Sequence, residues 1–63
     1  MTVKAMQRTP DEDTLERHDY TYTGVERVEV KKEIYGGVFL HLIFSDGRGL
    51  HLSVSSFDFE VEN

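Results

Sequence analysis

Much of the chain after residue 19 alternates apolar and polar positions with a period of two, the pattern of half-buried β-strands. The alternation covers residues 20–23, 28–34, 50–55 and 57–62. Residues 38–44 are apolar throughout apart from His41, which is typical of a central strand. The pattern predicts an antiparallel β-meander of three to four strands.

Two glycine-containing turns set the expected register of this meander. A three-residue loop at 45–47, with glycine in its left-handed position, places Leu42 opposite Leu50. The same loop type at 35–37 places Val30 opposite Leu42. Both turns bring the apolar rows onto one face, the expected core: Val28, Val30, Ile34, Val38, Leu40, Leu42, Phe44, Leu50, Leu52 and Val54.

The first part of the chain is patterned more weakly. Residues 1–8 are expected to form a short edge strand or to lack order. Residues 10–17 suit a short helix, since Thr9 can cap it and Pro10 fits its first position, but Leu15 is its only large apolar residue. We therefore expect an α+β, mostly β fold. A partly flexible segment 1–18, helical or irregular, precedes an antiparallel β domain at 19–63.

The face opposite the expected core carries Phe39, His41, Ile43 and His51. Phe39 and Ile43 need cover, and the sequence leaves three candidates open: the N-terminal segment, a second subunit or protein partner, and a ligand. Within the N-terminal segment the available side chains are Met6, Leu15, Tyr20 and Tyr22.

Composition restricts the function. A 63-residue chain without cysteine has no disulfides to stabilise its small core, so self-association is expected to supply the additional stability. Seven basic against twelve acidic residues, a net charge of −5, argue against direct nucleic-acid binding. Residues 1–10 lack the apolar region of an export signal, and no apolar stretch reaches the roughly 18–20 residues that a membrane span needs. We expect a cytoplasmic protein without membrane contact or cofactor.

Two alternatives rest on particular side chains. The register sets His41 across from His51, a pair that supplies only part of a zinc site, so weak metal binding is one alternative. The other is an acidic inhibitor that mimics nucleic acid through the ridge Asp58, Glu60 and Glu62. We expect no enzyme, because no acid–base pair can be located in the sequence.

One stretch resembles a known family. The Asp-Gly-Arg turn at 46–48, Phe57-Asp58 and Asn63 resemble the first motif of Sm-like RNA-binding proteins, which form rings from small bent sheets. The resemblance would imply base contacts by Phe57, Asp58 and Asn63. Leu52 stands where that motif has glycine, and Asn63 lies one position late. We therefore assign no family on this basis.

Together these patterns predict a small, acidic, non-enzymatic interaction protein. It is expected to form a homodimer or to bind a protein partner. The expected contact surface is the face of Phe39, His41, Ile43 and His51, or a strand edge.

Overall fold

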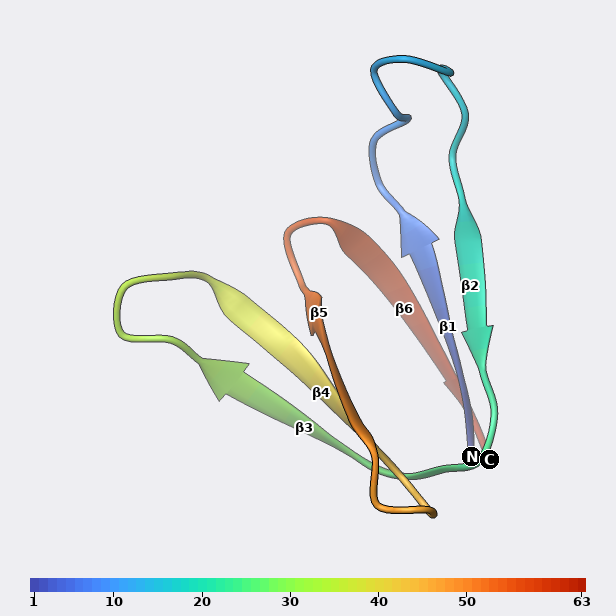
Figure 1. The fold of residues 1–63 in the computed structure, drawn as a ribbon, viewed down its shortest axis with the longest axis vertical. Helices are drawn as coiled ribbons and strands as arrows, with labels where there is room; N and C mark the ends of the chain where they lie inside the picture. The colour runs from blue at the N-terminus through green and yellow to red at the C-terminus, as the bar shows by residue number, and fades with distance from the viewer.

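The computed structural model describes all residues, 1–63, and contains six β-strands in two antiparallel sheets of three strands each. Sheet A has the strand order β2-β1-β6 and sheet B the order β3-β4-β5 (Figure 1). The strands are β1 (Thr2–Gln7), β2 (Asp19–Tyr22), β3 (Val25–Lys32), β4 (Val38–Phe44), β5 (Gly49–Ser53) and β6 (Phe57–Glu62).

The fold is all-β, so the expected α+β class with a helix at 10–17 is wrong. Residues 8–18 instead form a loop held by polar contacts. Asp11 accepts a hydrogen bond from Gln7 Nε2 at 3.3 Å and pairs with His18 Nε2 at 3.0 Å. No helix forms because its only large apolar side chain, Leu15, gives it no stripe to pack against the sheets. In the observed loop Leu15 is 78% exposed.

The predicted single meander is also wrong, because the last strand leaves it. β6 returns to pair with β1, with Val3 opposite Val61 and Ala5 opposite Phe59. β1, expected at an edge or without order, is therefore the centre of sheet A. Val3 and Ala5 are completely buried, so these two small side chains hold the strand in the core.

The β4–β5 register is confirmed. Leu42 lies opposite Leu50 and His41 opposite His51. Gly47 has a φ of 93°, the left-handed conformation that the predicted loop requires and that glycine adopts without steric cost.

The β3–β4 register differs from the prediction by two residues. Val30 pairs with Leu40 rather than with Leu42. The loop is longer than expected, and Glu33 N donates a hydrogen bond to Gly37 O at 3.2 Å across its base. Because side chains alternate with a period of two, a shift of two residues leaves every side chain on its predicted face.

The two sheets meet near the chain termini and diverge away from them (Figure 1). Met1 ties them together there, since its amino group donates to Val25 O at 2.8 Å and its carbonyl accepts from Val25 N at 3.1 Å. Val3 of sheet A packs with Val25 and Leu42 of sheet B in the core. Only 4 of the 63 residues are fully buried, so the core is small for the chain.

Candidate functional site

The outer face of sheet B is the side turned away from sheet A, and β4 builds its centre. Leu42 points into the core and is completely buried, so its neighbours His41 and Ile43 lie on the outer face. Phe39 and His51 share this face by register, and His51 is the most exposed of the four. The structure thus brings all four predicted binding residues together.

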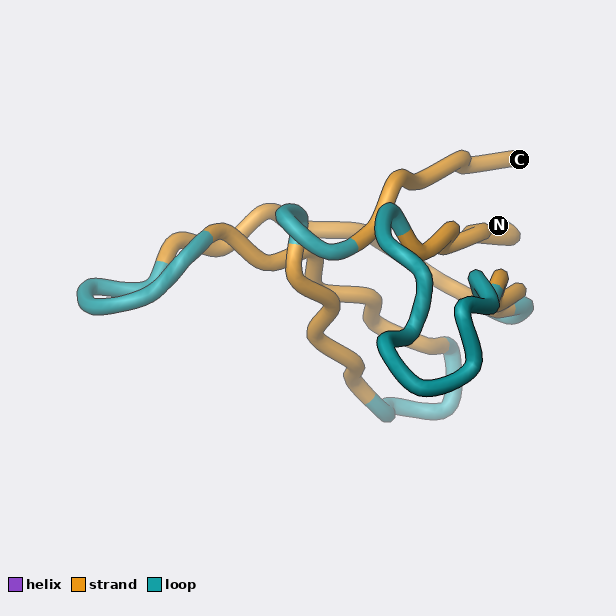
Figure 2. The backbone as a smooth tube through the Cα atoms, turned by 90° about the horizontal axis from the view of Figure 1, so that it is seen from above, coloured by secondary structure: helices purple, strands orange, loops and turns teal.

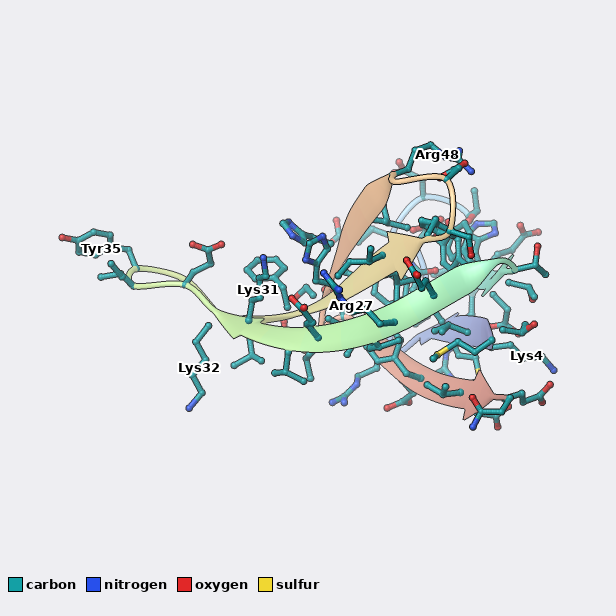
Figure 3. The ribbon with its side chains drawn as sticks, turned by 90° about the horizontal axis from the view of Figure 1, so that it is seen from below. Lys4, Arg27, Lys31, Lys32, Tyr35 and Arg48 are labelled. Atoms are coloured by element: carbon teal, nitrogen blue, oxygen red, sulfur yellow. The ribbon has the colours of Figure 1, made fainter.

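Basic side chains of β3 border this outer face. Arg27 lies opposite Ile43 and Lys31 opposite Phe39. Figure 3 shows Arg27 and Lys31 projecting from one side of β3 and Lys32 from the other. Glu29 lies between these two cations, opposite His41. The outer face therefore combines apolar side chains, imidazoles and charges of both signs.

The N-terminal segment does not supply the cover that was one candidate for Phe39 and Ile43. Its Tyr22 packs against the core on the opposite side of sheet B, with its ring 6.3 Å from that of Phe44. Tyr20 stacks edge-on against Phe57 at 6.1 Å, within sheet A. Val3, Ala5 and Tyr22 of these two strands thus pack in or against the core rather than over Phe39 and Ile43.

His41 and His51 form a close aromatic pair, with ring centroids 4.2 Å apart and an interplanar angle of 69°. Nδ1 of His41 is buried without a hydrogen-bond partner. Burial lowers the pKa of the His41 imidazole, and the nearby His51 and Lys31 lower it further. His41 is therefore a neutral packing group around neutral pH.

The structure brings no third metal-ligating side chain to this pair. No group of three or more histidine, aspartate or glutamate side chains converges in the structure. Glu29 lies opposite His41, but its carboxylate pairs with Arg27 Nε at 3.1 Å. A zinc site takes three or four protein ligands, so the metal-binding alternative loses support.

The acidic ridge lies on β6, where Asp58, Glu60 and Glu62 are all exposed. Asp58 pairs with Arg8 Nε at 3.1 Å, and Lys4 of β1 lies opposite Glu60. A mimic of nucleic acid needs uncompensated negative charge, and two of these three carboxylates have a basic neighbour. The inhibitor alternative is weakened accordingly.

The most exposed apolar surface of sheet B is one that the sequence did not predict. Val30, Ile34 and Tyr35 are 68%, 89% and 100% exposed, and we call them the hairpin patch. Sequence reasoning placed Val30 and Ile34 in the core. They are exposed because the β3–β4 hairpin extends beyond sheet A, as its tip at the far left of Figure 2 and the position of Tyr35 in Figure 3 show.

A shallow groove of about 370 Å³ lies between β2 and the β4–β5 turn. The Arg48 guanidinium carbon lies 5.4 Å from the centre of the Phe44 ring, and Arg48 Nε pairs with Asp46 at 2.7 Å. Burial raises the pKa of the Tyr22 hydroxyl, and Tyr20 raises it further. Because Asp46 already engages Arg48, this groove has no free cation for an anionic ligand. Its lining residues are Thr21, Tyr22, Thr23, Phe44, Arg48, Gly49 and Leu50.

No family model, curated protein or solved structure matches this chain. The resemblance to the Sm-like motif therefore has no support beyond the residues that suggested it. The structure has no helix with the length and apolar character needed to cross a membrane.

Proposed function

We propose that this chain is a small, non-enzymatic interaction protein that self-associates through sheet B, with the β3–β4 hairpin at the contact. The observation that carries the proposal is the exposure of Val30, Ile34 and Tyr35 at 68%, 89% and 100%. Large apolar side chains grouped on one projecting element are typical of surfaces that a partner covers.

The small core supports a second copy as the partner. With 4 of 63 residues fully buried and no disulfide, the chain has little intrinsic stability to spare. Association with another copy stabilises the folded state by mass action, because only the folded chain presents the contact surface. The outer face, with Phe39 and Ile43, stays available beside this contact for a further protein partner.

Molar mass in solution tests the proposal. Light scattering and sedimentation over a wide concentration range should show a dimer that dissociates on dilution. The double variant Ile34→Ser with Tyr35→Ser should be monomeric at concentrations where the unsubstituted chain is a dimer. A chain that stays monomeric up to its solubility limit would contradict the proposed function.

A matched control is available on the other sheet. Val61 of β6 is 50% exposed, so Val61→Ser also removes an exposed apolar side chain without touching the hairpin. This variant should dimerise like the unsubstituted chain. Equal loss of dimer in the control and in the hairpin variant would mean that general hydrophobicity, rather than the hairpin patch, drives association.

A further inference from the structure

We infer that two copies join by antiparallel pairing of their β3 strands, with Val30 of each copy on the twofold axis. The product is a continuous six-stranded sheet with the strand order β5-β4-β3-β3-β4-β5. This inference rests on the proposed self-association and adds to it the strand, the register and the residues that specify the partner.

Beyond Val25, which is hydrogen-bonded to Met1, β3 has a free edge that can accept another strand, because it lies at the end of sheet B and its strand partner there is β4. Glu33 N donates to Gly37 O, so the Glu33–Gly37 pair is a hydrogen-bonded one. Hydrogen-bonded pairs recur at every second residue of an antiparallel ladder. The odd-numbered residues of β3 therefore bond to β4, and the even-numbered residues point their N–H and C=O groups outward: Val28, Val30 and Lys32.

A twofold axis at Val30 uses these free groups. Val30 then forms a hydrogen-bonded pair with Val30 of the second copy, and Val28 forms one with Lys32 of the second copy. The contact covers Val30, which is 68% exposed, and the same register brings Ile34 next to Glu26 of the second copy, so the hairpin patch lies at the two ends of the contact.

Side-chain charges fit the same register. In an antiparallel pair centred on residue 30, Glu29 lies opposite Lys31 of the second copy, and Arg27 lies opposite Glu33. Each combination occurs twice by symmetry, so four oppositely charged pairs form beside the Arg27–Glu29 ion pair that each copy already has. They fall at non-hydrogen-bonded positions, where opposed side chains are closest and charge has its largest effect.

Neighbouring registers are worse. An axis at Glu29 sets Glu29 against itself and Arg27 against Lys31, and an axis at Lys31 sets Lys31 against itself and Glu29 against Glu33. An axis at Lys32 sets that cation against itself. Like charges directly opposite each other destabilise strand pairing.

An axis at Val28 is disfavoured because the start of β3 is already irregular and hydrogen-bonded to Met1. It would carry the pairing to the start of β3, where the β3 ladder is shifted between Val25 and Arg27. There Met1 already occupies the outer edge through its two hydrogen bonds with Val25. The register centred on Val30 uses residues 27–33 and stays clear of this contact.

Alternating charge often protects an edge strand from unwanted pairing. Here the alternating charges of Arg27, Glu29, Lys31 and Glu33 favour one pairing. Two antiparallel copies of β3 centred on residue 30 place each of these charges opposite a charge of the other sign. The pattern therefore rejects most partners and registers and accepts a second copy of this chain.

A charge-swap experiment tests the register. Glu29→Lys alone and Lys31→Glu alone each turn two attractive pairs into two repulsive ones, so each should weaken dimerisation by about tenfold or more. The double variant Glu29→Lys with Lys31→Glu restores two attractive pairs and should dimerise close to the unsubstituted chain. An equimolar mixture of the two single variants should form a heterodimer, because each chain then opposes the other's charges.

Glu62→Lys is the matched control for Glu29→Lys, since it changes the net charge by the same amount but lies on β6 of sheet A, opposite the uncharged Thr2. It should leave dimerisation nearly unchanged. If the unsubstituted chain dimerises but the single variants bind as tightly, or the double variant fails to recover, the register is overturned while the proposed self-association stands. A chain that never dimerises overturns both. Circular dichroism confirms that each variant is folded.

Discussion

The His41 imidazole lies against the backbone of Gly49, so closely that a Cβ atom at position 49 would be 2.8 Å from His41 Nε2. Gly49→Ala therefore requires the His41 ring or the β5 backbone to shift. Replacing glycine by alanine in a strand ordinarily stabilises a protein, so a lower free energy of unfolding in Gly49→Ala would be evidence for this contact. We expect a loss of about 1–3 kcal/mol in the free energy of unfolding, measured by urea denaturation.

Gly37→Ala is the control for this substitution. A Cβ atom at Gly37 would meet nothing within 4 Å, and its φ is not in the left-handed region. Alanine there should be neutral or should stabilise by about 0.4–1 kcal/mol, because it restricts the unfolded chain. Equal stability of the two variants would show that His41 does not occupy this position.

Stability should fall as the pH drops below the ordinary histidine pKa. Burial together with His51, Lys31 and Arg27 lowers the pKa of His41, with Glu29 opposing them. The unfolded chain therefore binds the proton more readily than the folded one. The lowered pKa of His41 therefore contributes to the free energy of unfolding. The contribution is complete above the unfolded-state pKa of about 6.5 and is lost as the pH falls from there towards the folded-state pKa.

Replacing the titrating group tests this pH dependence. His41→Asn removes the proton-binding site, so its free energy of unfolding should change less between about pH 7.5 and about pH 5 than that of the unsubstituted chain. His51→Asn should give an intermediate slope, since one cause of the lowered pKa is removed and burial remains. An unchanged slope in His41→Asn would contradict the assignment.

The period-two pattern was sufficient to assign faces, because a strand residue can point only to one side or the other. It correctly predicted that His41 lies beside His51 and that Gly47 takes the left-handed position of its turn. It could not tell which part of the core face would be covered. Val30 and Leu42 share that face and look alike in sequence, yet one is 68% exposed and the other completely buried.

The errors have physical causes. β1 contributes only Val3 and Ala5 to the core, small side chains that leave almost no pattern, so its central place in sheet A was missed. The pairing of β6 with β1 is non-local and carries no turn signal. The helix at 10–17 had a good start but nothing to pack against, and local propensity alone did not form it.

The unequal cover of the core face can be measured. Leu42→Ala should cost about 2–5 kcal/mol, much of the total stability of a chain this size, because Leu42 is fully buried between the sheets. Val30→Ala, measured at concentrations where the chain is monomeric, should cost less than about 1 kcal/mol. Similar losses at the two positions would mean that sheet A covers the hairpin as well.

Leu15 gives a stabilising substitution. Its φ of 58° is left-handed, a conformation that costs leucine about 1–2 kcal/mol and asparagine less, while its 78% exposure means that little burial would be lost. Leu15→Asn should therefore raise the free energy of unfolding, by up to about 1 kcal/mol. Leu15→Ala retains the Cβ atom that causes the strain and should bring no such gain. If residues 10–17 were helical in solution, the order would reverse, since asparagine is a poorer helix former than leucine or alanine. Urea denaturation of the two variants thus decides between the observed loop and the helix that the sequence favoured.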